Sequence, residues 1–198
     1  MLTKLTAIDS GDRFWNSVFN VPIDQIDISP ETRELFQRSF FYEPLPFVHR
    51  VVFISTPHHG SYFTGGYISD VLRRLISLPF KLLSPLQEVF QRSPAAVTAR
   101  SMGGEVPRST DNMSPDSLFI KTFSSIPIAP GVIAHSIIAV DNPEDPKAEW
   151  DDGVVAFSSA HIDGVASELI VHSGHSAQES PLAIEEVRRI LIENSKGP

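Results

Sequence analysis

The sequence predicts an α/β fold in which a mostly parallel sheet is flanked by helices. Three compact apolar runs have the length and β-branched content of buried strands, at residues 50–55, 132–140 and 168–172. Segments with helical periodicity alternate with these runs, which is typical of a parallel sheet covered by helices. We therefore expect the three strands in one sheet, with the first and third as neighbours.

The helical segments carry start and stop signals. Residues 2–19 have apolar side chains at helical spacing, and Gly11 interrupts the pattern. Ser29 is a predicted N-cap, with Pro30 at the first helical position. Residues 181–195 form the predicted closing helix. We expect its buried side to consist of apolar residues at Leu182, Ile184, Val187, Ile190 and Leu191.

Composition limits the class of protein and its partners. The 198 residues, with 41% hydrophobic content and no internal repeat, predict a single domain over residues 1–198. The net charge of -8 argues against nucleic acid and anionic membrane surfaces as partners. No cysteine is present, which excludes disulfides and thiolate chemistry. No segment approaches the roughly 20 apolar residues of a membrane span, and no signal core is found, so we expect a cytoplasmic protein without membrane insertion.

Three loops follow the predicted strands and should meet at one edge of the sheet. Ligands and catalytic groups gather at the carboxyl ends of parallel strands. The loops are "STPHHGS" at 55–61, the acid-rich "DNPEDPKAEWDDGVV" at 141–155 and "HSGHSAQ" at 172–178. An acidic loop beside a histidine loop supplies what a general base and its orienting carboxylate need.

Three motifs together resemble the α/β-hydrolase family of the lipase and esterase type. "VVFISTPHHGS" is similar to the strand and loop that follow the nucleophile region in many bacterial lipases. "DDGVVAFSSAH" resembles the loop that carries the acid of the triad, and "GHS" resembles the loop that carries its base. The acid precedes the base, as in the family. The resemblance covers most of residues 45–192 and implies a partial α/β-hydrolase fold.

The resemblance places the acid on Asp152 and the base on His175. In this chemistry a neutral imidazole takes a proton from a hydroxyl, while a carboxylate fixes the tautomer and stabilises the imidazolium. Each residue also has a structural alternative, as a turn aspartate before glycine and as a loop histidine. The alternative acids are Asp151, Glu149 and Asp163. We expect neighbouring acids to raise the pKa of whichever carboxylate is buried.

The nucleophile departs from the family pattern. The family's serine stands in a G-x-S-x-G elbow before the strand at 50–55, and this sequence has no such elbow there. We therefore expect a chain that starts downstream of the elbow and lacks the family's nucleophile, oxyanion loop and first strands. Alternatively, "ARSMGG" matches an A-x-S-x-G variant whose small flanking residues suit the strained turn, which makes Ser101 the candidate nucleophile. Its structural alternative is a glycine turn in a surface loop, and Ser61 and Ser176 are further candidates.

Two classes of function follow. The first is a serine hydrolase that takes a small-molecule carboxylic ester and needs no cofactor. The second is a catalytically silent hydrolase-like fragment, which serves as a binding or oligomerisation module or as half of a split enzyme. A sheet that begins mid-fold leaves an unpaired edge and an uncovered apolar face, so we expect a homo-oligomer that uses the N-terminal helix and residues 38–47. His58 and His59 should point in opposite directions, so we expect no shared metal.

Overall fold

The computed structural model describes residues 1–61, 83–98 and 114–197. Contacts divide the chain into two compact units. The sheet unit contains residues 1–8, 44–63 and 127–198, and the helical unit contains residues 9–43 and 64–126. The helical unit therefore consists of two insertions into the sequence of the sheet unit. A single-domain organisation over residues 1–198 stays a prediction.

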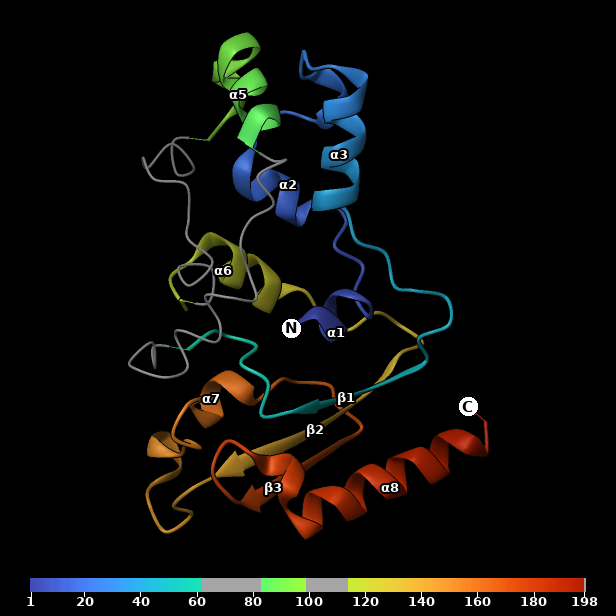
Figure 1. Ribbon diagram of the computed structural model, residues 1–198, viewed down its shortest axis with the longest axis vertical. Helices are drawn as coiled ribbons and strands as arrows, with labels where there is room; N and C mark the ends of the chain where they lie inside the picture. Colours follow the sequence, from blue (N-terminus) through green and yellow to red (C-terminus); the bar gives the residue numbers. More distant parts are fainter. Residues whose placement is uncertain (62–82, 99–113, 198) are drawn as a thin grey trace. The chain divides into compact units, whose positions relative to one another are not determined.

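The sheet of the described residues is parallel throughout. Strands β1 (Arg50–Ile54), β2 (Ile133–Val140) and β3 (Ser167–His172) lie in the order β1-β2-β3 (Figure 1). All three predicted strands are confirmed, but the prediction that the first and third are neighbours is wrong. Every residue of β2 after Ile133 is buried, whereas β1 and β3 alternate between more and less buried positions. The most continuously buried strand takes the central position, because only that position is covered on both faces and both edges.

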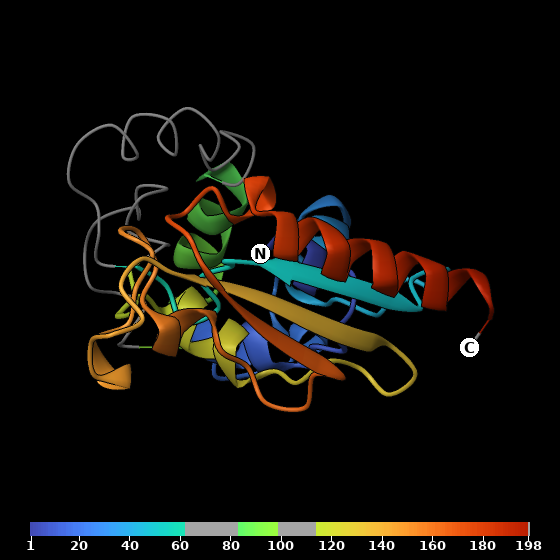
Figure 2. The same ribbon diagram turned by 90° about the horizontal axis from the view of Figure 1, so that it is seen from below.

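Helices cover both faces of this sheet. On one face, Ile137, Ala139 and Val171 form a core with Ala183 of α8 (Pro181–Ser195), which runs along the sheet in Figure 2. On the other face, one core packs beside α1 (Leu2–Leu5), and a second packs beside α7 (Phe157–Ala160). The predicted α/β class, a parallel sheet flanked by helices, is therefore confirmed in this part of the chain.

The closing helix α8 is confirmed, but its buried side differs from the prediction. Ala183 and Ile190 are buried, and Val187 packs against the sheet. In contrast, Leu182, Ile184 and Leu191 expose 62%, 52% and 61% of their surface. Residues 183, 187 and 190 follow the spacing of four and three that forms one stripe of a helix, and the other three lie off that stripe. Apolar periodicity was therefore insufficient to identify the stripe that faces the sheet.

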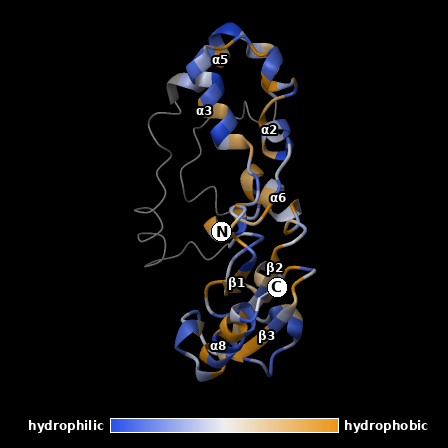
Figure 3. Cartoon of the chain, turned by 90° about the vertical axis from the view of Figure 1, so that its right-hand side faces the viewer, coloured by the Kyte–Doolittle hydropathy of each residue, from blue (hydrophilic) through white to orange (hydrophobic). Residues whose placement is uncertain are grey.

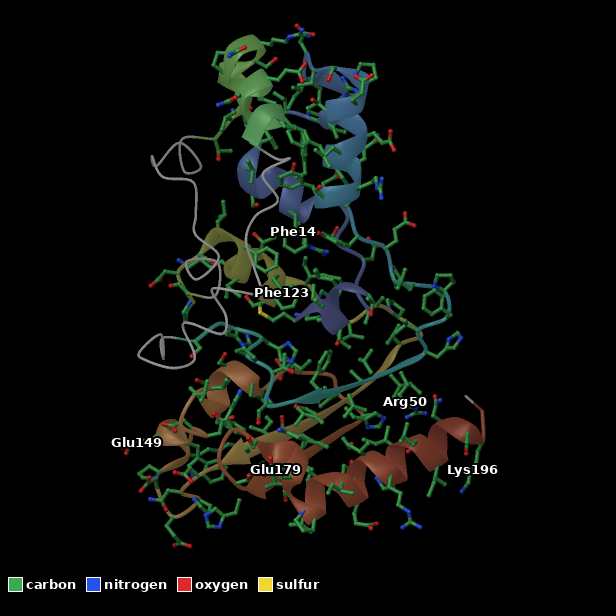
Figure 4. The ribbon with its side chains drawn as sticks, viewed as in Figure 1. Phe14, Arg50, Phe123, Glu149, Glu179 and Lys196 are labelled. Atoms are coloured by element: carbon green, nitrogen blue, oxygen red, sulfur yellow. The ribbon has the colours of Figure 1, made fainter. Side chains whose placement is uncertain are left out.

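A charged network joins the amino end of the sheet to α8. Arg50 Nη1 lies 2.7 Å from His135 Nε2 and 3.3 Å from a carboxylate oxygen of Glu193, and Figure 4 labels Arg50 above the C-terminal part of α8. His135 Nδ1 lies 2.8 Å from Ser167 Oγ, whose hydroxyl donates to Glu186. Burial first, and Arg50 second, lower the pKa of His135. Because a guanidinium only donates hydrogen bonds, Nε2 accepts and the ring proton lies on Nδ1.

The helical unit has a core of aromatic side chains. Trp15 and Phe19 stack with ring centroids 4.1 Å apart, and Phe36 packs beside both. The predicted N-cap is confirmed, because Ser29 Oγ accepts a hydrogen bond from Thr32 N at 3.2 Å. In Figure 3, hydrophilic and hydrophobic residues alternate along the helix that Ser29 caps, α3 (Pro30–Phe40), as an amphipathic helix requires. The helices of this unit are α2 (Arg13–Val18), α3 (Pro30–Phe40), α5 (Leu83–Arg92) and α6 (Leu118–Ser125).

Short 3-10 helices complete the described secondary structure, at Ile23–Gln25, Pro94–Ala96, Lys147–Glu149 and Ala177–Glu179. None of the helices in the described ranges is long and apolar enough to cross a lipid bilayer.

The contrast between neighbouring residues of α8 gives a prediction about stability. Ile190→Ala should lower the free energy of unfolding by about 2–5 kcal/mol, because it leaves a cavity under a fully buried side chain. Leu191→Ala, the matched control, should change it by less than about 0.5 kcal/mol, because Leu191 is exposed. Urea unfolding followed by circular dichroism measures both. Equal losses in the two variants would contradict this packing of α8.

Candidate functional site

The candidate site lies at the carboxyl edge of the sheet, where the loops after β2 and β3 meet. The segment after β2 is fastened to the strand end, because Asp141 N donates to Asp151 O at 2.8 Å. An antiparallel bridge between Asp151 and Ala156 closes the segment into a turn. Gly153 at the turn has φ of +84°, a conformation that favours glycine. This turn carries Asp152, and the loop after β3 carries His175.

Asp152 and His175 form a hydrogen-bonded pair. Asp152 Oδ2 lies 2.9 Å from His175 Nδ1. The other carboxylate oxygen, Oδ1, accepts hydrogen bonds from Val154 N at 3.0 Å and Val155 N at 2.7 Å. The Asp152 side chain is 1% exposed, whereas that of His175 is 45% exposed. The arrangement is a buried carboxylate in a fixed orientation against an imidazole that reaches solvent.

The electrostatics of the pair correct one expectation from the sequence. Burial acts to raise the pKa of Asp152, but the hydrogen bonds from His175 and from the Val155 and Val154 amides outweigh it and leave this pKa lowered. The predicted rise caused by neighbouring acids is therefore wrong, because hydrogen bonds to the charged form dominate. The hydrogen bond to Asp152 in turn raises the pKa of His175 against the opposing effect of burial.

The pair leaves one ring nitrogen of His175 available. Nδ1 faces Asp152, and within the described ranges no residue makes a hydrogen bond to Nε2. An open cavity of about 410 Å³ lies beside the ring, lined by the loop from 172 to 181 with Ser176 and Glu179 among its residues. Figure 4 labels Glu179 on this loop, next to the start of α8. His175 itself is among the residues that line this cavity, and its side chain is 45% exposed.

The serine candidates have different positions. Ser101 lies outside the described residues, so its role stays a prediction. Ser61 Oγ donates a hydrogen bond to Val154 O at 2.6 Å, which engages its hydroxyl with the backbone of the Asp152 turn. Ser176 is exposed at the start of a 3-10 helix, where its side chain makes no capping hydrogen bond.

The three alternative acids lie elsewhere. Asp151 Oδ1 accepts a hydrogen bond from Gly153 N at 2.7 Å, within its own turn. Asp163 lies 3.5 Å from His161 rather than from His175. Glu149 is exposed on the segment before the turn, as labelled in Figure 4. Of the predicted acids, Asp152 is therefore the one that contacts His175.

The adjacent histidines differ strongly in their surroundings. His58 is fully buried, with its ring edge-on to Phe53 at 4.6 Å between centroids, and neither ring nitrogen has a hydrogen-bond partner in the described part of the chain. His59 is exposed, and its backbone N–H donates to Ser159 O at 3.2 Å. The two rings thus lie in different environments. The described ranges contain no group of three or more side chains placed to hold a metal ion.

Two serines that the sequence analysis did not predict as site residues form hydrogen bonds near the site. Ser159 is 6% exposed, and its hydroxyl donates to Gly60 O. Ser55 is 3% exposed with φ of +41°, and its Oγ accepts a hydrogen bond from Ala139 N at 3.2 Å. The position of Ser55 directly after a strand was a visible signal, whereas nothing in "FSSA" distinguishes Ser159 from its neighbour Ser158.

Comparison of the chain with protein-family models, with curated proteins and with solved structures gives no match. The class of site is therefore defined by geometry: a hydrogen-bonded carboxylate–imidazole pair at the carboxyl edge of a parallel sheet.

Buried His58 gives a prediction about pH. Its pKa is lowered to about 3, mainly by burial and then by Lys4, the N-terminal amine and His59. The folded chain therefore keeps His58 neutral at pH values where the unfolded chain protonates it, so stability should fall as the pH drops below 6.5 toward 3. His58→Phe removes this titration and should lose less stability between neutral pH and about pH 5 in urea unfolding. His59→Ala is the control, and an unchanged pH dependence in His58→Phe would count against the neutral buried state.

Proposed function

We propose that this protein is a serine hydrolase that acts on small-molecule carboxylic esters without a cofactor. The observation that carries the proposal is the Asp152–His175 pair. Its carboxylate is buried and held by two backbone amides, while its imidazole is 45% exposed and belongs to a loop that lines an open cavity. This is the arrangement that orients a general base for attack by a hydroxyl.

The chemistry follows from the geometry of the pair. Asp152 accepts a hydrogen bond from the Nδ1–H group, so the lone pair of neutral His175 lies on Nε2. Nε2 takes the proton of a serine hydroxyl as its oxygen attacks the ester carbonyl, and later returns that proton to the leaving alkoxide. Asp152 stabilises the imidazolium formed between these steps. Among the serines, Ser101 is the proposed nucleophile because of its small flanking residues.

A second candidate function is a catalytically silent hydrolase-like module for binding or oligomerisation, or half of a split enzyme. One observation favours it: in the part of the chain that the structure describes, no serine hydroxyl makes a hydrogen bond to His175. In this form the acid and base are present, and another polypeptide segment supplies the nucleophile. A cytoplasmic location is part of both proposals.

Exposed apolar side chains in the sheet unit support the proposed homo-oligomer. Leu2 and Phe47 expose 81% and 72% of their surface. Static light scattering at micromolar concentration should give at least twice the mass of one chain. The double change Leu2→Ser with Phe47→Ser should shift the protein toward the monomer, whereas Leu191→Ser should not, because the proposed interface uses the N-terminal helix and residues 38–47 rather than α8. A single-chain mass for the unmodified protein would contradict the proposal.

The catalytic proposal is tested by hydrolysis of p-nitrophenyl butyrate. His175→Ala and Asp152→Asn should each lower kcat/KM by several powers of ten, because members of a catalytic unit are strongly interdependent. Ser101→Ala should lower kcat/KM by a similar factor, because Ser101 is the proposed nucleophile. His49→Ala is the matched control, because this exposed histidine lies before the amino end of β1. Ser61→Ala and Ser176→Ala complete the series.

The outcomes separate the candidates. Activity that survives His175→Ala removes the hydrolase mechanism. Activity lost in His175→Ala but retained in Ser101→Ala moves the nucleophile to another serine. An inactive unmodified chain supports the silent module. An active enzyme should also lose rate as the pH falls through the pKa of His175, which lies above its ordinary value of 6.5, because only the neutral ring acts as a base.

A further inference from the structure

Two segments of the sheet unit are joined by serine hydroxyls beside the candidate site. The first is the loop at residues 55–61, after β1, and the second is the segment at 150–160, which contains the Asp152 turn. Ser61 Oγ donates to Val154 O at 2.6 Å. Ser159 Oγ donates to Gly60 O and lies 3.3 Å from His59 N, whose N–H also reaches Ser159 O. The loop after β1 is thus fastened to the acid-bearing segment at two points.

The first of these contacts acts on the group that orients the carboxylate. Val154 presents its N–H to Asp152 Oδ1 and its carbonyl to the hydroxyl of Ser61. A shift of Val154 would therefore move a donor that holds Asp152, and Asp152 in turn holds Nδ1 of His175. The hydroxyl of Ser61 lies two hydrogen bonds away from the Asp152 carboxylate.

The second contact, made by Ser159, is buried, and its hydroxyl has a partner both as donor and as acceptor. Ser159 is 6% exposed, and its hydroxyl both donates and accepts, which is how a buried hydroxyl avoids a desolvation cost. Its neighbour Ser158 is exposed. The chain therefore contains a matched pair of serines, of which one bridges the two segments.

The loop that supplies these contacts is itself fixed to the sheet. Ser55 N donates to Ile137 O at 2.9 Å, and Ser55 Oγ accepts from Ala139 N at 3.2 Å. Ser55 has φ of +41°, in the left-handed region, so the strand turns sharply where the loop begins. The loop at 55–61 is therefore hydrogen-bonded to β2 at its first residue and to the Asp152 turn at its last residue.

We propose that Ser61 and Ser159 are positioning residues, which hold the Asp152 turn so that its carboxylate stays on Nδ1 of His175. The proposal deepens the proposed function and rests on it for its catalytic meaning, but the contact that it describes can be measured without substrate. It gives Ser61 a role other than that of nucleophile.

The test is an NMR titration of the His175 imidazole, assigned by its loss in His175→Ala. Asp152→Asn should bring the pKa of His175 down toward its ordinary value, because the hydrogen bond to the carboxylate raises it. Ser61→Ala and Ser159→Ala should each move the pKa in the same direction. Ser158→Ala should leave it unchanged. Ser61→Thr, which keeps the hydroxyl, should retain the pKa of the unmodified chain.

Amide hydrogen exchange provides a second readout. Val154 and Val155 N–H groups should exchange about five- to tenfold faster in Ser61→Ala, the effect of losing one hydrogen bond from the turn. If Ser159→Ala does not fold, Ser61→Ala and Ser61→Thr decide the result, because Ser61 is only half-buried. An unchanged His175 pKa in both alanine variants overturns the proposal, and so does an unchanged pKa in Asp152→Asn. A shifted pKa in a chain without esterase activity supports the positioning role while the hydrolase proposal fails.

Discussion

The parallel pairing of β2 with a strand on each side is the constraint on which the candidate site depends. Parallel strands end at the same edge of a sheet, so the loops after β1, β2 and β3 are delivered to one place. Asp152 and His175 come from two of these loops, and the third supplies the hydroxyl of Ser61. An antiparallel arrangement of either neighbour would carry one of these groups to the opposite edge. The geometry of the candidate site therefore depends first on the direction of the strands and only then on its individual side chains.

The two edges of the sheet use histidine in opposite ways. At the amino edge, Arg50 occupies Nε2 of buried His135, and burial and the guanidinium lower the pKa of the ring. At the carboxyl edge, Asp152 binds Nδ1 of the partly exposed His175, raises the pKa of the ring and leaves Nε2 without a hydrogen bond from the described residues. The first ring has neither a free lone pair nor access to solvent, so it serves to join strands. His175 has a free lone pair and is exposed to solvent, so of these two histidines only His175 is suited to proton transfer.

The sequence allowed prediction of features that depend on local residues, and was less informative where long-range packing decides. Strand runs and the Ser29 cap depend on neighbouring residues, and the order of Asp152 and His175 followed from motifs. The order of the strands depends on which apolar segment is buried most completely. That burial is decided by the helices that cover both faces of the sheet, which the sequence of a strand does not reveal. The orientation of α8 and the lowered pKa of Asp152 depend on the same distant packing and on backbone amides that carry no sequence signal. Ser159 was hidden because its partner, Gly60, is distant in the chain.

Hydrogen bonds within the sheet unit hold the points where the chain leaves that unit and returns to it, and this affects how the length of the inserted segments can change. The chain leaves the sheet unit after residue 8, returns at 44, leaves again after 63 and returns at 127. Leu45 N donates to Thr6 O at 2.9 Å, and Ala129 N donates to Ala7 O at 2.8 Å, so the first departure and both points of return are fastened together within the sheet unit. The entropic cost of closing a loop between fixed ends grows only slowly with its length. The ends of the two insertions can therefore keep their places in the sheet unit when a loop between them changes in length, which costs little in chain entropy.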